Sequence, residues 1–477
     1  MSINIRSIIF INGIVVCCLA MAMAVPMIFD LIVHSGKCVG IFASSILASI
    51  FFGGLMIFSC RTTGEVPFSR KDVFLLVVSM WTITSIICAF PFYIYSGVKL
   101  SFISALFESV SGITVTGATI YPDVEILPRA LNLWRFILHF MGGAGIVAIG
   151  IFILPIMRIG GMQLFLTENS DKSQRFLPRA FQTVGFFIGI YVLLIGIFVI
   201  FLKIAGMGLF DSLCHSISAI STGGFSTRNT GIEWYKSCKI EIIISMAMFV
   251  GGITFLEIVR CFKNGIREFL NNQQTKGYLK VVGVMTIVPI LITTITSNET
   301  VSLNGIASHI FQVISAITTT GLDCSKSYIA PKIVLILLAI IGGCSGSTAG
   351  GIKIFRIQIL YAVLKNHINK MVRPFDVTIP KYQNKKIDNS LIVSIISLIV
   401  ILAIVFIVSV AAIELLSGRE TLECIYSVTS CLFNLGYDVG FSEFSPPSKL
   451  VFIFDMIIGR LEVIPFFIIL SKIFWKK

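Results

Sequence analysis

Four short segments of the chain carry Ser, Thr and Gly at a spacing that could supply oxygen ligands to an ion. Each begins at a Ser and reaches a Gly six residues later, and the four align without a gap at 111–117, 218–224, 315–321 and 430–436. The first three are close relatives, whereas the fourth is divergent. Glycine allows the positive φ that a tight turn often requires, and carbonyl and Thr hydroxyl oxygens are neutral cation ligands.

The ligands that these segments offer are uncharged, because no Asp or Glu lies within them. A ring of carboxylates would suit a divalent ion, so its absence favours a weakly hydrated monovalent cation, K⁺ before Na⁺. The alternative is that the segments are small-residue contacts between helices. Four copies in register, each between two apolar stretches, favour an ion filter over that alternative.

The elements that must position the segments are membrane helices. Of the 477 residues, 56% are hydrophobic and 13% charged, a balance that is not typical of a soluble protein. Stretches of about 20 apolar residues, enough to cross the hydrocarbon core, occur ten times. They cover approximately 7–33, 39–60, 72–95, 131–157, 182–206, 240–259, 281–297, 333–360, 391–416 and 450–471.

Each Ser-to-Gly segment closes a semi-apolar run of about a dozen residues, which is too short to span a bilayer and predicts a re-entrant half-helix. Helix-starting residues precede the runs at Ser101, Asp211, Asn304 and Thr421. Non-helical backbone at membrane depth must be buried in protein or line a water-filled cavity, so the four turns should meet at one axis. The C-terminal ends of the half-helices would then point at the axis and favour a cation.

The order of these elements predicts an all-α integral membrane protein with two initial helices and four repeats, each a helix, a half-helix, a turn and a helix. The boundaries are 1–66 for the initial two-helix domain and 67–165, 166–270, 271–380 and 381–477 for the four pore repeats. Small residues at 20–24 have the spacing of a signal-peptide cleavage site. A first membrane helix is favoured, because the apolar run continues past them and a second one follows closely.

The net charge of +13 does not indicate a nucleic-acid partner, because the basic residues sort by loop. Most of them lie in segments that are inside if the N-terminus is inside, among them Arg158, Lys172, Arg175, Arg179, Lys365, Lys370, Arg373, Lys381, Lys385 and Lys386. This positive-inside asymmetry predicts that both termini are cytoplasmic. The 12 cysteines and five histidines show no metal-binding spacing.

Two further features interrupt the apolar stretches. The stretch 342–351 holds five glycines in the expected second helix of the third repeat. Glycine costs about 1 kcal/mol relative to Ala in a helix interior, so the helix should break there, although close helix packing through small residues is the alternative. Arg460 lies in the last stretch, where a charge is expensive and faces a cavity or a partner; a salt bridge to Glu257 is one alternative.

Taken together, these residues closely resemble the Trk/Ktr/HKT superfamily of potassium transporters, and specifically its bacterial TrkH-type membrane subunit. The matching features are the four segments with 133–135, 142–146, 342–353 and 459–462, and they cover nearly the whole length. The resemblance implies that the repeats are M1-P-M2 pore-loop units around a pseudo-four-fold axis. It further implies gated, channel-like K⁺ uptake across the bacterial cytoplasmic (inner) membrane.

By position, the resemblance assigns the only metal site, a K⁺ filter, to Val115, Thr116, Gly117, Thr222, Gly223, Gly224, Thr319, Thr320, Gly321, Asn434, Leu435 and Gly436. The fourth segment lacks the Thr of the first three, which would loosen selectivity against Na⁺. An intramembrane loop beneath the filter and a pore-facing arginine would form the gate. These gate residues are Gly342, Gly343, Ser345, Gly346, Ser347, Gly350, Gly351, Lys353 and Arg460.

The resemblance also implies a homodimer and a cytoplasmic TrkA-type regulatory subunit that binds a nucleotide, NAD or ATP. The chain itself is expected to hold no covalent cofactor. The basic loop 365–386 is either a docking surface for the regulator or a solvated positive-inside loop. Acidic residues near the pore loops either concentrate cations at the mouth or are simply solvated. They are Asp123, Glu125, Glu233, Asp323, Asp438 and Glu443.

The rival mechanism is a coupled secondary symporter, in which H⁺ or Na⁺ movement drives K⁺. A proton path needs titratable residues within the membrane, and Glu108 and Glu257 are the candidates that stand out. An enzyme is not expected, because no His/Asp/Glu or Cys/His arrangement has catalytic spacing.

Overall fold

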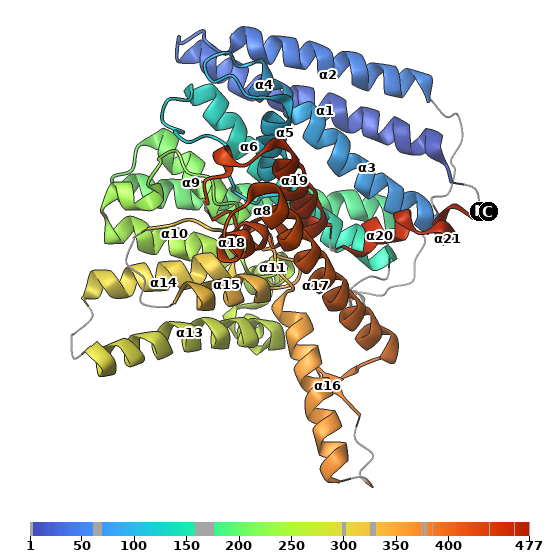
Figure 1. The fold of residues 1–477 in the computed structure, drawn as a ribbon, viewed down its shortest axis with the longest axis vertical. Coiled ribbons are helices and arrows are strands. Elements are labelled where there is room, and N and C mark those ends of the chain that lie inside the picture. Colours follow the sequence, from blue (N-terminus) through green and yellow to red (C-terminus); the bar gives the residue numbers. More distant parts are fainter. Residues whose placement is uncertain are drawn as a thin grey trace. The chain divides into compact units, whose positions relative to one another are not determined.

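The computed structural model describes residues 3–60, 69–157, 176–297, 302–324, 331–373, 375, 379–383, 385–437, 439–461 and 463–476. Within these ranges the chain is almost entirely helical, with a single two-stranded hairpin (Figure 1). Several features singled out in the sequence lie outside the described residues. They are Arg158, Lys172, Arg175, Asp438, Glu462 and the boundaries at 66 and 165.

The chain forms two compact units, and each is described by itself. The first comprises Met1–Gly143, Gly223–Asn229 and Phe406–Lys477, and the second Ala144–Thr222 and Thr230–Val405. Two long helices, α6 (Arg129–Met157) and α17 (Asn389–Ser417), contribute to both units. The first unit therefore combines the two ends of the chain with a short stretch that begins at the last two residues of the second Ser-to-Gly segment.

The first unit begins with the helical pair α1 (Ile5–Ile32) and α2 (Val39–Ser59). Small residues let the pair approach closely, because a Cβ on Gly13 would lie 2.9 Å from Gly53 O. Helix α3 (Arg70–Cys88) starts at a capping box in which Ser69 and Asp72 satisfy each other's backbone N–H groups. The same Asp72 carboxylate accepts a hydrogen bond from Asn4 N at 2.8 Å and ties α3 to the start of α1.

The rest of the first unit consists of shorter helices. They are α4 (Phe90–Ile94), α5 (Phe102–Ile113), α18 (Thr421–Leu432), the 3₁₀ turn η2 (Phe441–Glu443), α19 (Pro446–Arg460), α20 (Ile464–Leu470) and α21 (Lys472–Trp475). Helix α19 packs against both half-helices of this unit, α5 and α18. An aromatic cluster of Phe107, Phe441, Phe444 and Phe452 fills the contact between α5 and α19.

The second unit holds two half-helices among longer helices. Its elements are α8 (Phe176–Ile204), α9 (Leu209–Ser221), η1 (Gly231–Tyr235), α10 (Cys238–Gly251), α11 (Phe255–Asn264), α12 (Ile266–Asn271), α13 (Gln273–Ser297), α14 (Leu303–Ile317), α15 (Lys332–Ile341), α16 (Ile354–Val372), β1 (Lys381–Tyr382) and β2 (Lys385–Lys386). The antiparallel hairpin β1–β2 packs Tyr382 against Phe355 of α16.

All four predicted half-helices are present as α5, α9, α14 and α18, with 12, 13, 15 and 12 residues. Ser101 caps α5 as predicted, and α18 begins at Thr421. The other two start slightly earlier than expected, so Asp211 and Asn304 lie in the first turns of α9 and α14. Helix length was therefore well predicted, and helix starts were correct to within one turn.

Six described helices are long and apolar enough to cross a membrane, or seven if the bent pair α10 and α11 is one span. Two of the ten predicted stretches are not single helices: within 240–259 the chain turns by 102° after Gly251, and within 450–471 Val463 has a φ of 58°. The predicted break in the third repeat is confirmed, because α15 ends at Ile341 and α16 starts at Ile354.

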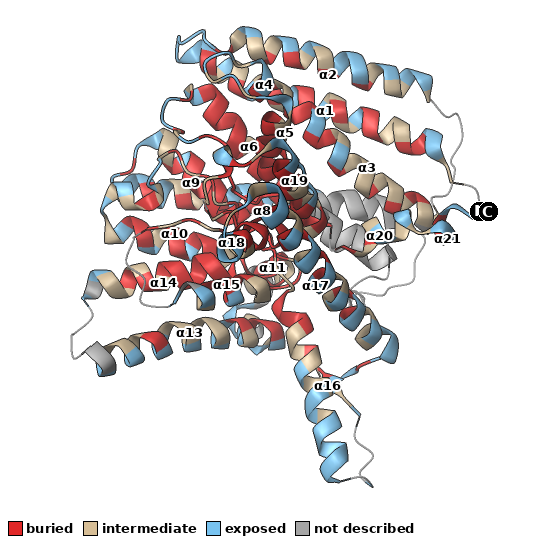
Figure 2. Ribbon diagram, viewed as in Figure 1, coloured by how far each residue is buried: buried red, intermediate tan, exposed pale blue. Residues whose placement is uncertain are grey.

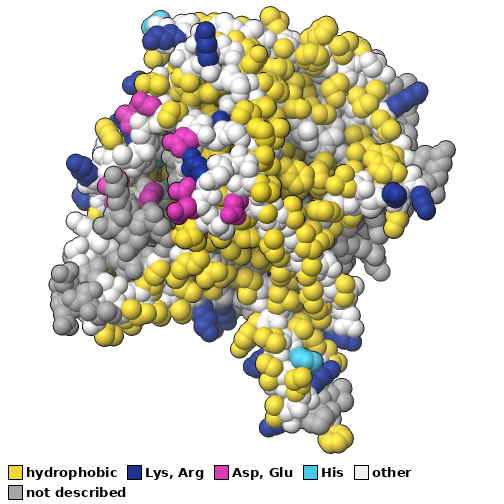
Figure 3. All heavy atoms as spheres, in the orientation of Figure 1, with side chains coloured by type: hydrophobic (Ala, Val, Ile, Leu, Met, Phe, Trp, Pro, Cys, Tyr) yellow, Lys and Arg dark blue, Asp and Glu magenta, His cyan; other side chains and the backbone are white. Residues whose placement is uncertain are grey.

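Buried residues concentrate in the half-helices and their turns, whereas α2 and the far end of α16 are largely exposed (Figure 2). Hydrophobic side chains cover much of the visible surface (Figure 3). Exposed apolar residues on helices of this length are expected where a helix faces lipid. The half-helices therefore form the interior of each unit, and the long helices provide apolar outer surface.

Candidate ion-conducting site

Each half-helix ends in the same turn, with two left-handed residues at fixed positions after the anchoring Ser. The φ angles are 58° at Val115, 56° at Thr222, 54° at Thr319 and 53° at Asn434, and then 86° at Gly117, 85° at Gly224, 73° at Gly321 and 75° at Gly436. The left-handed pair falls at positions that the Ser-anchored alignment makes equivalent, and it includes Gly224 rather than Gly223.

The residue between each left-handed pair keeps a negative φ, so the sign of φ alternates along the turn. This alternation distinguishes the turn from an extended strand, in which every residue keeps a negative φ. All four turns thus share one backbone conformation, with φ values that alternate in sign.

Local hydrogen bonds explain why the turns form. Val115 N donates to Gly112 O at 3.2 Å and Thr116 N donates to Ser111 O at 2.9 Å, which are the two bonds of a Schellman motif. The equivalent bonds elsewhere are Thr222 N to Ala219 O (3.1 Å), Thr319 N to Ala316 O (3.0 Å), Thr320 N to Ser315 O (2.8 Å), Asn434 N to Cys431 O (3.3 Å) and Leu435 N to Ser430 O (2.8 Å).

The residue types at the left-handed position are unusual. A Schellman motif normally has Gly there, because a Cβ in left-handed backbone clashes with the neighbouring carbonyl. Val115, Thr222 and Thr319 are β-branched, for which a positive φ is a genuine outlier. Strain of this kind costs about 1–3 kcal/mol per residue and concentrates at functional sites.

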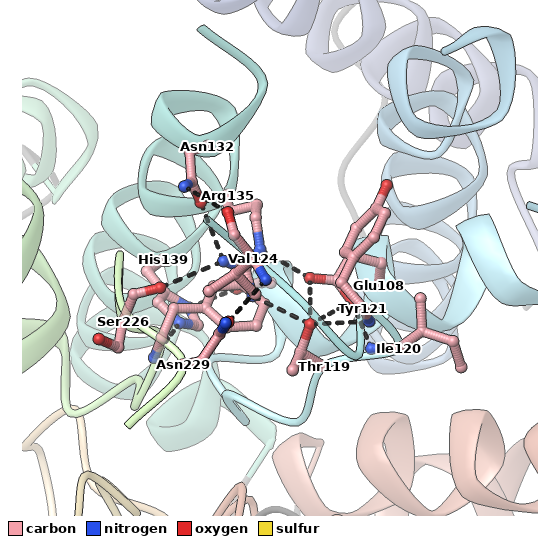
Figure 4. Close-up of polar contacts among 12 residues, drawn as sticks. Glu108, Thr119, Ile120, Tyr121, Val124, Asn132, Arg135, His139, Ser226 and Asn229 are labelled. Carbon is pink, nitrogen blue, oxygen red and sulfur yellow. Dashed lines mark hydrogen bonds and ion pairs between the residues drawn. The ribbon is translucent and has the colours of Figure 1, made fainter. Parts of the chain in front are cut away.

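A buried ion pair contacts the chain just after the first turn (Figure 4). Arg135 Nε on α6 lies 2.7 Å from Glu108 Oε1 on α5, with side-chain exposures of 1% and 0%. The second carboxylate oxygen accepts a hydrogen bond from Ile120 N at 2.9 Å, and Arg135 Nη2 donates to Thr119 Oγ1 at 3.1 Å. The pair therefore fixes the chain that leaves the first turn.

Two further side chains on α6 connect the first turn to the stretch that follows Gly223. His139 Nδ1 lies 3.0 Å from Gly112 O, and Phe225 N donates to His139 Nε2 at 3.3 Å. This pair of bonds fits the tautomer with its proton on Nδ1. The Arg135 guanidinium stacks 4.0 Å from the centre of the Phe225 ring, so one helix supports both segments.

The fourth segment differs in its side chains and not in its backbone. In the first and third segments two Thr hydroxyls are hydrogen-bonded to each other. The Oγ1 atoms of Thr114 and Thr116 are 2.7 Å apart, and those of Thr318 and Thr320 are 2.8 Å apart. Phe433 and Leu435 occupy these positions in the fourth segment. In their place the Asn434 amide reaches the first segment, where Nδ2 donates to Thr116 Oγ1 at 2.8 Å.

Glycines allow the segments of the first unit to touch. A Cβ on Gly117 would lie 2.9 Å from Gly224 Cα, and one on Gly436 would lie 2.9 Å from the Thr116 carbonyl carbon. Gly459 packs against the fourth turn, since its Cβ would lie 3.0 Å from Asn434 Oδ1. The structure thus brings together the first segment, the end of the second and the fourth.

The second unit contains Thr222, the third segment and the Gly-rich connection 342–353 between α15 and α16. This connection is folded and buried, with Gly342, Gly346, Gly351 and Lys353 at φ angles from 74° to 78°. It contacts both turns of the unit directly: Gly350 N donates to Thr319 Oγ1 at 2.7 Å, and Thr222 Oγ1 donates to Thr348 Oγ1 at 3.2 Å.

Further bonds hold the same connection to the bend between α10 and α11. Thr348 Oγ1 lies 3.0 Å from both Ile220 O and Gly251 O, Cys344 N donates to Gly252 O at 2.9 Å, and Thr254 Oγ1 donates to Ser345 O at 2.7 Å. Thr348 was not singled out in the sequence, although its three oxygen contacts make it the side chain that ties the connection to the second turn.

The charged residues singled out in the sequence have defined neighbours. Glu257 pairs with Arg260 at 2.8 Å, and Arg460 is buried at the end of α19 with 5% exposure. Among the outer acids, Glu125 lies 3.8 Å from Arg228 and Glu443 lies 2.5 Å from Arg419. Two of the acidic residues expected to concentrate cations near the pore loops are therefore paired with arginines.

The outer loop of the first unit is braced by an amide and a carboxylate. Asn229 Nδ2 donates to Asp123 Oδ1 at 2.8 Å, and Val124 N donates to Asn229 Oδ1 at 2.8 Å. The hydrogen bond from the Asn229 side chain, with a second from Glu125 N, lowers the pKa of Asp123 below its ordinary value. The loop that carries the first turn is thereby tied to the one that follows the second.

Two buried charged residues were missed in the sequence. Lys449 Nζ donates to Ser442 O at 3.1 Å near the start of α19, and Asp455 is 0% exposed in the middle of the same helix. Asp455 is the single charge in the apolar run 450–458, Lys449 directly precedes that run, and an ionisable residue in such a setting is itself a signal.

Long apolar helices, together with four half-helices that end in one shared backbone turn, define a multi-pass membrane protein. A sequence profile of the TrkH family, described as cation transport protein, matches residues 40–476. The chain belongs to this family.

Relatives and a solved structure resemble the chain over its whole length. It is 30% identical over 489 residues to the Trk system potassium uptake protein TrkH of Escherichia coli (strain K12), and 29% identical over 486 residues to TrkG of the same organism, with 99% of each chain covered. The crystal structure of the potassium transporter TrkH from Vibrio parahaemolyticus matches with a TM-score of 0.91, 28% identity, and coverage of 99% of this chain and 100% of that one.

Proposed function

We propose that the chain takes up potassium ions across the cytoplasmic membrane of a bacterium through a gated, channel-like pore. The relatives above are titled potassium uptake proteins and a potassium transporter. The observation that carries the proposal is the repeated turn, with two left-handed residues at equivalent positions in all four segments. Neutral carbonyl oxygens on such turns suit a monovalent cation.

The proposed filter consists of residues 115–117, 222–224, 319–321 and 434–436. Its fourth part is expected to discriminate least, because Phe433 and Leu435 remove the hydroxyl pair that supports the first and third turns. The Asn434 amide compensates in part by bonding to Thr116. We therefore expect K⁺ to be preferred over Na⁺ without strict exclusion.

The proposed gate is the connection 342–353 together with Arg460. Opening would require the connection to leave the hydrogen bonds that Thr348 and Gly350 make to the second and third turns. A fixed guanidinium at the end of α19 would add an electrostatic barrier to cations. If the two parts act independently, their removal should have additive effects on the free-energy barrier and multiplicative effects on flux.

The regulatory partner is proposed to dock on α16 and the hairpin that follows. This helix carries exposed apolar side chains at helical spacing next to Lys365, Lys370 and Arg373. They are Tyr361, Leu364, Ile368 and Met371. A continuous apolar row on an exposed helix marks an interaction surface. We propose two partners for the chain: a TrkA-type nucleotide-binding subunit and a second copy of the chain. Both termini are proposed to lie in the cytoplasm.

A coupled H⁺ or Na⁺ symporter is the second candidate mechanism. The residues expected to serve a proton path, Glu108 and Glu257, each form an ion pair with an arginine. Asp455 favours this candidate more than they do, since it has no ion pair among the described residues.

The test is K⁺ and Na⁺ uptake in a host that lacks its own potassium uptake systems. Gly117→Ser and Gly321→Ser should abolish or relax selective K⁺ uptake, because a Cβ cannot be placed at these left-handed positions without strain. Gly189→Ser in α8 is the matched control, since no atom lies within 4 Å of its added Cβ. Wild-type flux and selectivity in both correctly inserted filter variants would refute the proposed pore.

A further inference from the structure

In the first unit, the Asp455 carboxyl group is buried in helix α19 and has no cationic partner among the described residues. Asp455 lies in α19 within the apolar run 451–458 and is 0% exposed. Ser409 Oγ on α17 donates to Asp455 Oδ1 at 2.7 Å, and Oδ2 has no hydrogen-bond partner among the described residues. An ionisable residue in this setting is expensive and marks a functional site.

Two other buried acids, Glu108 and Glu257, are better satisfied than Asp455. Glu108 accepts hydrogen bonds from Arg135 and from Ile120 N, and Glu257 is paired with Arg260. Asp455 has a single hydroxyl donor in place of an arginine. A carboxylate with so little compensation costs more to bury than a neutral carboxyl group does. The site therefore favours the form that carries a proton.

The charged and titratable groups on the neighbouring helices form no ion pair with Asp455 within the described part of the chain. On α5, Glu108 is paired with Arg135, and on α17, Glu414 accepts a hydrogen bond from Thr421. On α18, the Cys431 thiol is within electrostatic range of Asp455. On α19 itself, Lys449 donates a hydrogen bond to Ser442 O, and Arg460 lies five residues after Asp455. Within the described part of the chain, none of these groups forms an ion pair with Asp455.

The residue after Asp455 is part of the support of the fourth turn. Met456 O accepts a hydrogen bond from Asn434 Nδ2 at 3.2 Å, and the same amide donates to Thr116 Oγ1 of the first turn. Any shift of α19 at this point acts directly on the Asn434 amide. The Ser409 bond holds α19 to α17 at the neighbouring residue, so its strength controls that position.

We propose that Asp455 is a proton-binding site whose occupancy controls cation flux, an inference that rests on the proposed function. Arg460 lies about 7.5 Å further along α19 at 1.5 Å per residue. When the carboxyl group releases its proton to water, the new negative charge offsets the field of Arg460 and strengthens the Ser409 bond. Flux increases as the proton leaves, and therefore increases with pH.

The experiment measures K⁺ flux into liposomes that contain the purified full-length protein, over a range of pH. Wild-type flux should rise with pH along a single-proton curve, whose slope is at most about tenfold per pH unit. Asp455→Asn should be independent of pH. Ser409→Ala should move the midpoint to higher pH, because the ionised carboxylate loses its hydrogen-bond donor. Glu423→Gln, an exposed carboxylate on α18, should keep the wild-type curve.

Infrared difference spectra of the same samples provide a readout that does not depend on transport. A protonated-carboxyl band should disappear as pH rises in the wild type and be absent from Asp455→Asn. An unchanged pH profile in Asp455→Asn, or a flat wild-type profile with active flux, would overturn the proposal. Absence of K⁺ flux in the wild type at every pH would refute the proposed function instead, while the infrared band would still report on the proton site. If Asp455→Asn does not fold, an unshifted midpoint in Ser409→Ala is the overturning result.

Discussion

Removing the arginine behind the first turn is the sharpest test of how the proposed filter is held. Arg135→Met keeps the aliphatic stem and removes the guanidinium that contacts Glu108, Asn132 and Thr119. Glu108 would then be a fully buried carboxylate with only a backbone donor at Ile120 and a Thr hydroxyl. The loop that leaves the first turn would lose its fixed support.

The expected cost follows from the burial of the pair, since both side chains are 1% exposed or less. Breaking a buried ion pair on one side costs about 3–5 kcal/mol, whereas replacing both partners with neutral groups of similar size is close to neutral. Arg135→Met should therefore strongly destabilise the protein and abolish selective K⁺ flux. The double variant Glu108→Gln with Arg135→Met should recover much of the stability.

The assay is a double-mutant cycle of thermal stability in detergent, combined with K⁺ and Na⁺ flux in liposomes. The coupling free energy between the two positions should reach at least about 2 kcal/mol. A destabilisation in the double variant that equals the sum of the two single effects would show that the pair has no mutual dependence. Wild-type stability and selectivity in Arg135→Met alone would refute the idea that this network supports the turn.

Three further predictions concern the fourth turn, the proposed gate and the outer loop. Leu435→Thr should raise the K⁺ to Na⁺ permeability ratio, measured from reversal potentials, because it returns one hydroxyl to the fourth turn; an unchanged ratio would contradict this. Thr348→Val should raise flux about fivefold if it loses one hydrogen bond of about 1 kcal/mol from the closed state, and unchanged flux would argue against the gate. Asp123 has a lowered pKa, so its bond to Asn229 stabilises the outer loop above pH 3.8 and is lost as pH falls through the lowered value. The melting temperature should fall in that acid range in the wild type and not additionally in Asn229→Ala.

The half-helices and the broken helix could be predicted because composition and length determine them directly. A run of about a dozen apolar residues cannot span a bilayer, and five glycines cannot continue a helix. The bend after Gly251 was not predicted, since 240–259 is uniformly apolar and the cause of the bend is its contact with the distant connection 342–353. Local composition contains no information about such a contact.

The side chains that support the turns were mostly beyond sequence reasoning. Glu108 and Arg135 were each noted, yet nothing in their spacing of 27 residues predicts that they pair. The left-handed Val115 and Thr222 run against the usual preference for Gly at a helix end. Asp455 escaped notice because one acid in an apolar run barely changes its overall hydropathy. Long-range pairing and strain depend on the folded structure.

The hydrogen bond between Asn434 and Thr116 has a consequence for how the protein is made. The two residues are 318 positions apart, and the fourth turn also needs Gly459 of α19 as its support. Thr116 in the first turn therefore acquires its hydrogen-bond donor, Asn434, only after nearly the whole chain has been synthesised. A ribosome-released fragment that ends before α18 would lack part of the proposed filter, so a prematurely terminated chain should insert into the membrane without forming the proposed pore.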